Sequence, residues 1–500
     1  MIVAPAAALA MAIDAPARTP RLAHSIVAAE VYDLDAHRVL FARNAAKLMV
    51  AASTTKLLTE GSSLALLGAG FRWTTPVYRT GPIDARGVVH GDLVLVATGD
   101  PNLSQRIRSD GTLAFEDEDH AYDGSPETKA VPGDPLAVLR DLANQVAKAG
   151  VTAIDGRVLV DGSLFPDQGA ESGTGVTVSP IVVNDNVVDV TVTPGSHAGD
   201  AASLTVSPQT PYARFVNKTT TGAPKSDATI DMSQDVADAA GRHTVTVTGS
   251  QAAGPSVLYA YRVGDPKRFA QDAFALALRD AGVAVPASES TQPGDVTPAL
   301  IPANLVAQHE SPPLSEDAYI TLKVSDNLHA ALMPYIWAVY LAHAKRDYLR
   351  EGFALEAKLL SDAGPDLQGA AQQDGEGGSA FFTADFMVRY LAWARTQTWY
   401  RYLLRGLPVM GVDGTLAGIQ KHSPARGKVF AKTGTDDSEN FLDGGSVIEK
   451  GLAGYMTTRG GRHVAFAFYI SAMKGPQDED TGTVAGQILG AMAAATYTSI

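Results

Sequence analysis

The stretch VAASTTKLLT places a serine and a lysine three residues apart, at Ser53 and Lys56. Side chains at positions i and i+3 emerge from the same face of a helix. An amine held beside a hydroxyl can act as the base that activates a serine nucleophile. The alternative interpretation is an ordinary helix-start serine followed by a solvated lysine, because such a pair also arises by chance.

A second copy of this spacing, at Ser471 and Lys474, shows how weak the pair is by itself. The second copy continues the strand-like run VAFAFYIS. In a strand, positions i and i+3 point to opposite faces, so these two side chains are not expected to meet. Only the first copy is therefore a candidate for nucleophilic catalysis.

The tripeptide SDN at residues 325–327 falls between two apolar runs with helical spacing. An Asp or Asn at such a place is ordinarily a helix cap. The functional interpretation is a turn in which Ser325 presents a hydroxyl, and Asn327 an amide, toward the nucleophile. Taken alone, the tripeptide favours the cap.

The tripeptide KTG at residues 432–434 ends the alternating stretch GKVFAKTG. The ordinary interpretation is an exposed Lys432 before a turn glycine. The functional interpretation needs Gly434 so that a substrate backbone can approach the strand closely and pair with it as an added strand.

The elements that must position these motifs follow from the hydrophobic pattern. Residues 25–45 alternate and break at residues 35–37, which predicts a β-hairpin. From Ser53 the apolar residues follow helical spacing up to the Gly-Ala-Gly breaker at residues 68–70. Residues 75–300 contain mainly short strand-like runs, with two helix-like segments, PLAVLRDLANQVAKAG and KRFAQDAFALALRDAGVAV.

Helical patterning returns at Ala318 and extends through most of the following hundred residues. The last part of the chain contains three strand-like runs, GKVFAKTG, GLAGYMTT and HVAFAFYIS, and a final helix-like run, TVAGQILGAMAAATY. An N-terminal hairpin joined to three C-terminal strands would form an antiparallel sheet flanked by helices.

We therefore predict an α/β (α+β) fold built from both ends of the chain, with two nested β-rich inserted domains. The catalytic domain would comprise residues 1–74 and 301–500. The first inserted domain would comprise residues 75–183 and 262–300, and the second residues 184–261. The division of the insertion is expected because it is large for a single domain of short polar strands.

Composition excludes several classes of function. The chain has 500 residues, of which 45% are hydrophobic, and it contains no cysteine, which excludes disulfides and thiol catalysis. Its 40 Lys and Arg against 54 Asp and Glu give a net charge of -14, which would repel a nucleic-acid backbone. Nucleic acid is not an expected partner.

The chain begins with the apolar run MIVAPAAALAMA, which lacks the basic residues that open an intact secretory signal. Two interpretations stay open: the remnant of an export signal, or an alanine-rich mature chain end. No other run approaches the roughly 20 continuous apolar residues that span a bilayer, so no transmembrane anchor is expected.

The order of the three motifs is more specific than any one of them. A Ser-x-x-Lys pair near the N-terminus, then SDN, then KTG on a C-terminal strand is the motif order of penicillin-recognising serine enzymes. The separation of Ser53 from Ser325 is 325 - 53 = 272 residues. Class A β-lactamases have no room for such an insertion, and no Glu-x-x-Leu-Asn run supplies their deacylating glutamate.

The chain instead resembles the three-domain D-alanyl-D-alanine carboxypeptidase/endopeptidases of the penicillin-binding protein 4 type (class C low-molecular-mass penicillin-binding proteins). The segments ATGDPNL, DGSLF, VNDNVVDVTVTPG and GVDGTL add to the three motifs, and the resemblance extends from about Ser25 to the C-terminus. It implies a serine-type peptidase that forms an acyl-enzyme.

The resemblance assigns catalytic roles to four residues in the first two motifs. Ser53 would be the acylated nucleophile and Lys56 its general base. Ser325 would relay a proton toward the leaving group, and Asn327 would hold the substrate's amide.

It assigns substrate-binding roles to the third motif. Lys432, itself counted as catalytic, would help keep Lys56 neutral and, with Thr433 and Thr435, would bind the substrate's terminal carboxylate beside Gly434. Backbone N–H groups of Ser53 and Thr435 would form the oxyanion hole. No metal and no cofactor are implied.

By its position after DGSLF, Asp167 would read the amino group of a diaminopimelate side chain, the alternative being an ordinary loop aspartate. The implied partners are peptidoglycan stem peptides ending in D-Ala-D-Ala, with β-lactams as covalent inhibitors. The implied location is extracytoplasmic, in a periplasm or cell-wall compartment.

Two alternative functions stay open: a related D-amino-acid peptidase, esterase or amidase on the same scaffold, and a non-catalytic wall-binding protein. The intact motif set speaks against the latter. Two acidic segments, residues 104–134 and the run DDSENFLDGG after KTGT, are interpreted as solvated loops. We hypothesise that the second of them disfavours anionic stem peptides.

Overall fold

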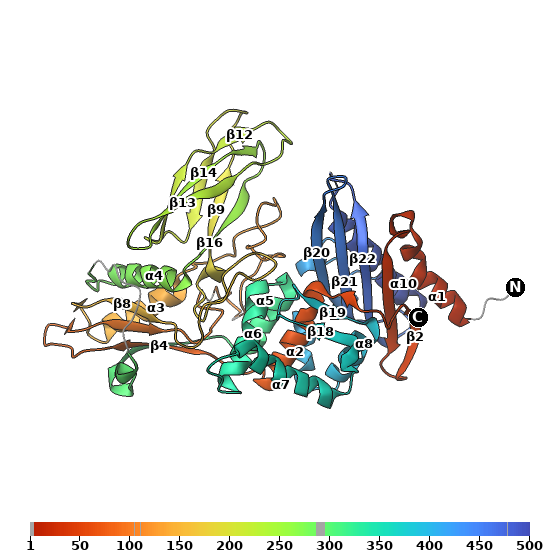
Figure 1. The fold of residues 1–500 in the computed structure, drawn as a ribbon, viewed down its shortest axis with the longest axis horizontal. Helices are drawn as coiled ribbons and strands as arrows, with labels where there is room; N and C mark the ends of the chain where they lie inside the picture. The colour runs from red at the N-terminus through yellow and green to blue at the C-terminus, as the bar shows by residue number, and fades with distance from the viewer. Residues whose placement is uncertain (1–4, 105, 111, 287–295, 478) are drawn as a thin grey trace. The chain divides into compact units, whose positions relative to one another are not determined.

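The computed structural model describes residues 5–104, 106–110, 112–286, 296–477 and 479–500 (Figure 1). The chain forms two compact units. One unit joins the two ends of the chain, Met1–Phe71 and Leu314–Ile500, and the other is the intervening segment, Arg72–Pro313. The finer division of this segment at residues 184–261 stays a prediction.

A five-stranded antiparallel sheet lies at the centre of the first unit, in the strand order β2-β1-β22-β21-β20. Its strands are β1 (Ile26–Asp33), β2 (Arg38–Arg43), β20 (Val429–Asn440), β21 (Gly445–Thr457) and β22 (His463–Gly475). β1 pairs with both β2 and β22, so the N-terminal hairpin joins the C-terminal strands as predicted.

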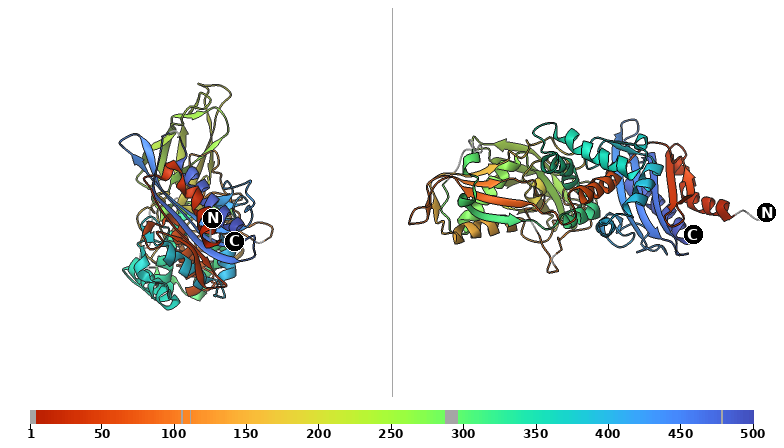
Figure 2. Two further views of the ribbon diagram at one scale, coloured as in Figure 1. Left: turned by 90° about the vertical axis from the view of Figure 1, so that its right-hand side faces the viewer. Right: turned by 90° about the horizontal axis from the view of Figure 1, so that it is seen from below.

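Helices cover both faces of this sheet. The helices α1 (Pro5–Asp14) and α10 (Thr481–Ser499) lie side by side, and α10 packs on β21 and β22 (Figures 1 and 2). On the other face, α8 (Ala384–Ala394) packs against β1 and β22. Because both faces of the sheet are covered, its central strands β1 and β22 are mostly buried and rich in apolar residues, as in the run VAFAFYI of β22.

The helix predicted to start at Ser53 is present as α2 (Lys56–Leu66), which begins three residues later, and other helices of this unit pack around it. α2 contacts α5, α6 and α9. These helices and α7 have the bounds α5 Leu314–Val324, α6 Asn327–Tyr340, α7 Tyr348–Ala363 and α9 Tyr400–Gly406. The helices predicted from Ala318 onward are therefore present, and SDN lies between two of them as expected.

A small antiparallel sheet in the same unit has the order β18-β19-β3, with bounds β3 Met49–Val50, β18 Ala370–Gln372 and β19 Ala380–Phe382. β3 is short, and the chain passes from it directly into a 3-10 turn, η3 (Ala52–Thr55), and then into α2. The pairing of β3 with β19 fixes where that turn begins.

The second unit has its largest sheet in the order β17-β4-β6-β8 and two long helices, α3 and α4, where the sequence predicts helices. The bounds are β4 Thr74–Arg79, β6 Leu93–Val96, β8 Val158–Asp161, β17 Leu305–Glu310, α3 Ala137–Lys148 and α4 Pro266–Asp280.

Four smaller sheets complete this unit: β10-β9-β16, β11-β14-β13, β12-β15 and β5-β7. Their bounds are β5 Val88–Val89, β7 Ala153–Ile154, β9 Val187–Thr193, β10 Ser203–Ser207, β11 Ala213–Asn217, β12 Thr220–Gly222, β13 Asp231–Ala237, β14 His243–Thr248, β15 Ser250–Ala252 and β16 Val257–Arg262. One continuous hydrophobic core includes Val77 of β4, Phe274 of α4 and Val247 of β14.

The two acidic segments match the predicted solvated loops only in part: the described residues of 104–134 form a loop in which several side chains are buried, and the second run is exposed but begins in a strand. In residues 104–134, His120 is buried, and its two ring nitrogens lie 2.7 Å from Asp185 and 2.7 Å from Asp189 of the same unit. The run DDSEN continues strand β20 as far as Asn440, paired with β21. Contacts with distant segments, which local composition does not report, position His120 and the strand residues of DDSEN.

Candidate active site

The predicted nucleophile lies in the 3-10 turn just before α2. Ser53 is half-buried, whereas Lys56, the first residue of α2, is fully buried. The Lys56 Nζ donates a hydrogen bond of 2.8 Å to the Ser53 Oγ. The two side chains therefore meet, as the i, i+3 spacing predicts.

Close backbone approaches hold this turn in place. A Cβ at Gly434 of β20 would lie 2.5 Å from the Ala51 carbonyl oxygen and 3.1 Å from the Thr54 nitrogen. A Cβ at Gly377, in the loop before β19, would lie 2.0 Å from the Ala52 carbonyl oxygen. Only glycine fits at these two positions, so Gly434 brings the KTG strand against the nucleophile turn.

Two serines of the site are associated with left-handed backbone, which non-glycine residues rarely adopt. Ala52, directly before Ser53, has φ +44°, and Ser325 has φ +70°. Such conformations cost about 1–3 kcal/mol each and persist only where the surrounding structure enforces them. Here they turn two hydroxyl groups toward one place.

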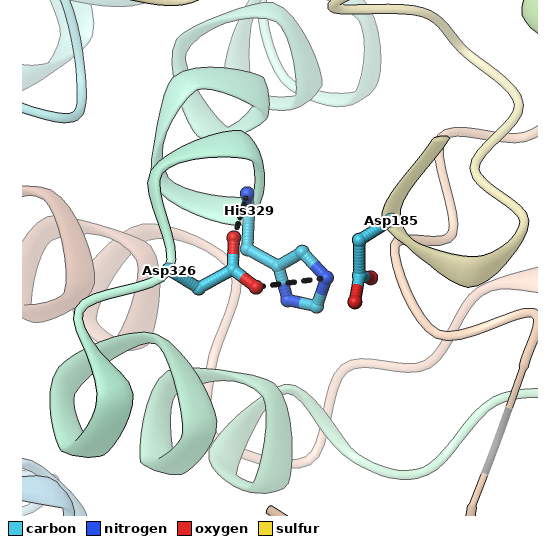
Figure 3. Close-up of side chains that lie close together, drawn as sticks. All are labelled: Asp185, Asp326 and His329. Atoms are coloured by element: carbon cyan, nitrogen blue, oxygen red, sulfur yellow. Dashed lines mark hydrogen bonds and ion pairs between the residues drawn. The ribbon is translucent and has the colours of Figure 1, made fainter. Parts of the chain in front are cut away.

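The SDN turn is both a helix cap and a turn that presents side chains toward the nucleophile. Asp326 is the N-cap of α6, because its carboxylate accepts a 2.9 Å hydrogen bond from the His329 N–H (Figure 3). The flanking side chains, Ser325 and Asn327, reach Lys56 instead. The cap is therefore Asp326 alone, which leaves its two neighbours available for chemistry.

Four oxygen atoms surround the Lys56 ammonium. Besides Ser53, it donates to Asn327 Oδ1 and, at 3.2 Å, to the Glu376 carbonyl oxygen, and Ser325 Oγ lies at 3.5 Å. None of these partners is an ionised carboxylate. These oxygens hold the Lys56 amine beside the hydroxyl groups of Ser53 and Ser325.

Lys432 of β20 reaches the same place from the sheet. It is fully buried, so the interpretation of an exposed lysine is wrong, and its Nζ donates a 2.9 Å hydrogen bond to Ser325 Oγ. Burial, then the charges of Lys56 and Lys450, lower the pKa of Lys432 well below its usual range. The Ser325 hydroxyl therefore bridges two amines, the arrangement that a proton relay needs.

The other KTG side chains are also positioned by hydrogen bonds. Thr433 Oγ1 lies 2.7 Å from Thr415 Oγ1, in the GVDGTL segment. A Cβ at Gly414 would lie 2.4 Å from the Lys323 carbonyl oxygen, and Lys323 also binds Asp413 at 2.9 Å. The GVDGTL segment, to which the sequence patterns assign no role, therefore places Thr415 against the KTG strand.

A second residue that the sequence analysis missed is Glu60, one helical turn after Lys56. Its carboxyl group is fully buried, and neither oxygen has a hydrogen-bond partner among the described residues. Burial, then Asp317, raise the pKa of Glu60 well above its usual range, while His329 and Lys56 act in the opposite direction. The same burial that raises this pKa disfavours the charged form of the Glu60 carboxyl group.

Asp167, the tentative substrate-reading residue, lies in the second unit. Ser179 Oγ donates a 2.7 Å hydrogen bond to one carboxylate oxygen of Asp167, and Lys267 Nζ lies 2.8 Å from the other. An incoming amino group would have to compete with Lys267, and the role of Asp167 stays a prediction.

Comparison with known proteins agrees with this geometry. The family model of the D-Ala-D-Ala carboxypeptidase 3 (S13) family matches residues 9–492. A D-alanyl-D-alanine carboxypeptidase from Actinomadura sp. (strain R39) is 29% identical over 460 residues, which cover 86% of this chain and 77% of that protein.

Solved structures show the same fold. Penicillin binding protein 4 (dacB) from Haemophilus influenzae superimposes with a TM-score of 0.71 at 20% identity, covering 96% of this chain and 97% of that one. The same protein in complex with a novel β-lactam also gives 0.71 at 20% identity, with 98% and 99% covered. With the family model spanning nearly the whole chain, this protein belongs to the D-Ala-D-Ala carboxypeptidase 3 (S13) family and is a serine-type D-Ala-D-Ala carboxypeptidase.

Proposed function

We propose that this enzyme hydrolyses the terminal D-Ala-D-Ala bond of peptidoglycan stem peptides through an acyl-enzyme on Ser53. The observation that carries the proposal is the chain of short contacts from Ser53 through Lys56 and Ser325 to Lys432. It supplies a nucleophile, a base and a relay in one cluster.

In the first half-reaction, Lys56 Nζ takes the proton of Ser53, and Ser53 Oγ attacks the carbonyl carbon of the penultimate D-alanine. The backbone N–H groups of Ser53 and Thr435 stabilise the resulting oxyanion. Asn327 accepts from Lys56 through Oδ1, so its NH2 group is the donor that we assign to the substrate's amide carbonyl.

The amide then breaks as its nitrogen receives a proton. Lys56 returns the proton that it took from Ser53 to Ser325 Oγ while Ser325, also hydrogen-bonded to Lys432, gives its own hydroxyl proton to the leaving amine. Lys56 is then neutral again, and free D-alanine departs. In the second half-reaction, Lys56 takes a proton from water, the hydroxide oxygen attacks the ester carbonyl, and Ser53 regains its proton. Each turnover consumes one water molecule.

We propose that the substrate backbone lies along β20, which is an edge strand of the sheet. Residues 408–410 bridge this edge near Phe430 and Ala431, ahead of the KTG residues. Gly434 allows close approach, while Lys432, Thr433 and Thr435 bind the terminal carboxylate. Both carboxypeptidase and endopeptidase cleavage are compatible with this path, because each releases an amine next to a carboxylate.

The proposed partners are stem peptides ending in D-Ala-D-Ala and, as covalent inhibitors, β-lactams, whose strained amide would acylate Ser53 without losing its leaving group. The corresponding location is extracytoplasmic. No helix in the described part of the chain has the length and apolar character needed to cross a membrane. A non-catalytic wall-binding role is disfavoured, because such a role would not require a buried pair of lysines around one serine.

The first test is mass analysis of the intact protein after mixing with benzylpenicillin, followed by peptide mapping and a time course. We expect a persistent adduct on Ser53, absent from Ser53→Ala and present in Ser471→Ala, together with release of D-alanine from D-Ala-D-Ala peptides. An adduct on another residue, or none in a folded protein, would overturn the assigned nucleophile. Faster turnover of other D-substrates would favour the related peptidase or esterase.

A further inference from the structure

Lys450 of β21 lies directly opposite Thr435 in the antiparallel pairing of β20 with β21. Its Nζ donates a hydrogen bond to Thr435 Oγ1. Nothing in the local sequence IEKGLAG indicates this contact, because it depends on the register between two strands. Lys450 is thus attached to the last residue of the KTGT run.

Among the described residues, Thr435 is the hydrogen-bond partner of the Lys450 side chain. No Asp or Glu in the described ranges lies within ion-pair distance of the Lys450 Nζ. The nearest acidic influence is Asp480, whose carboxylate caps α10 by accepting a 2.8 Å hydrogen bond from the Thr483 N–H. Within the part of the chain that the structure describes, Lys450 is therefore a partly covered cation with no ion-paired carboxylate.

Packing of α10 holds the Lys450 stem in this position. A Cβ at Gly486 would lie 3.4 Å from Lys450 Cε, and a Cβ at Gly482 would lie 3.6 Å from Thr435 Cγ2. Burial lowers the pKa of Lys450 to about 8, although Asp480 acts in the opposite direction. The ammonium form still predominates at neutral pH, but it is poorly solvated and would gain from an anionic ligand.

The hydrogen bond from Lys450 also fixes what Thr435 can do. A threonine hydroxyl has one donor hydrogen and two acceptor lone pairs. Because Lys450 donates to the oxygen, the hydroxyl hydrogen of Thr435 is left to donate elsewhere. Thr435 becomes a donor backed by a positive charge, which matches a carboxylate and does not match a neutral amide equally well.

We infer that Lys450 is a specificity-determining residue: together with Thr435, it selects substrates whose leaving group carries a free carboxylate. This inference rests on the proposed function, because it assumes that the substrate's terminal carboxylate lies beside the KTGT residues. Lys450 acts through charge and through the orientation of Thr435, not as an acid or a base in the reaction.

The test compares a D-Ala-D-Ala peptide with a free carboxylate and the same peptide as its C-terminal amide. Lys450→Met keeps the apolar stem and removes the charge. We expect kcat/KM for the free acid to fall by about 10-fold to 100-fold, the usual effect of losing a hydrogen bond to a charged group, mainly through KM. The value for the amide should change by less than about twofold, and Lys450→Arg should retain most of the preference.

The matched control is Lys474→Met in the neighbouring strand β22, whose ammonium binds Asp443 at 2.9 Å. This variant should leave kcat/KM unchanged for both the free-acid and the amide peptide. Thr435→Val should reproduce part of the loss, and the double variant Lys450→Met/Thr435→Val should lose less than the sum of the two, since both act through one contact. In the unmodified enzyme, the preference for the acid should decline as pH rises through about 8.

The outcomes separate this inference from the function on which it rests. If the unmodified protein forms no adduct on Ser53 with benzylpenicillin, the proposed function fails. If the adduct forms but Lys450→Met lowers kcat/KM equally for the free-acid and the amide peptide, or lowers it for neither, the role of Lys450 in selecting the carboxylate is overturned.

Discussion

Two regions of the first unit carry the same spacing, serine followed three residues later by lysine, with opposite results. At Ser53 and Lys56 the two side chains are 2.8 Å apart and the lysine is fully buried. At Ser471 and Lys474 the pair lies in β22, and the lysine side chain is 56% exposed and bound to Asp443. The serine-lysine spacing can support catalysis only where the backbone places the hydroxyl and the amine on one face and packing excludes water from the amine.

The largest difference between the two copies should appear on removing the hydroxyl groups. Ser53→Ala should lose acylation by benzylpenicillin and lower D-alanine release by about 10⁴-fold or more, because the nucleophile is gone. Ser471→Ala should retain both activities. Intact-mass analysis and a D-alanine assay measure the two effects, and an adduct on Ser53→Ala would place the nucleophile elsewhere.

Removing the amines should give the next largest difference. Lys56→Met leaves Ser53 in place without a base, so we expect acylation to slow by about 10²-fold to 10⁴-fold, the usual contribution of general base catalysis. Lys474→Met loses only a surface ion pair and should acylate at the normal rate. The measurement is the rate of adduct formation by stopped-flow or quenched mass analysis. A Lys56→Met variant that keeps a tenth of the rate would contradict the assignment of the base.

The free energy of unfolding should also distinguish the buried Lys432 from the exposed Lys474. Removing the buried amine should raise stability although it lowers activity. Lys432 has a folded pKa below its unfolded value, so its burial destabilises the fold fully below the folded pKa, and this cost is relieved as pH rises toward about 10.4. Lys432→Met should therefore raise the free energy of unfolding by about 1–3 kcal/mol at pH 7, with a gain that shrinks at higher pH, while abolishing most activity.

Urea unfolding of Lys432→Met between pH 6 and 10, compared with Lys474→Met, provides the measurement. The exposed control should show a change close to zero throughout. A Lys432→Met variant less stable than the unmodified protein at pH 7 would mean that the amine stabilises the fold and is held by partners stronger than Ser325 and Thr433.

The smallest effect is expected from the acidic part of β20. Asp436, Asp437 and Glu439 directly follow KTGT, and burial, then Asp437, raise the pKa of Asp436. Their joint replacement by Asn, Asn and Gln should improve turnover of anionic stem peptides relative to neutral ones by about twofold to fivefold at low salt, and less at 1 M salt. Glu351→Gln, on the exposed side of α7, is the control. An unchanged preference between acidic and neutral stems would end this hypothesis.

Much of the fold was accessible from the sequence because it depends on local patterns. Alternation predicts β1, β2 and β22, and 3.6-residue periodicity predicts α3, α4 and α10, all of which the structure contains. The exceptions are segments ordered by distant partners. His120 is anchored between Asp185 and Asp189, where the two carboxylates outweigh burial and raise the pKa of His120, and the polar end of β20 is held by β21.

The candidate site shows the same limit. Residue types and motif order were enough to select Ser53, Lys56, Ser325, Asn327 and Lys432, and the structure brings these five together. The contributions of Lys450, Thr415 and Glu60 were not visible in the sequence. Each depends on a register or a packing contact between segments far apart in the chain.

The sequence alone determined the chemical groups, the motif order, and the alternation that makes a central antiparallel sheet. Only the tertiary structure decided which lysine side chains are shielded from solvent, because their burial depends on every segment that packs around them. It buries Lys56 and Lys432 on either side of Ser325 and leaves Lys474 in solvent. The Ser-x-x-Lys spacing is the same in both places, and the different surroundings of the two lysines come from the fold around them.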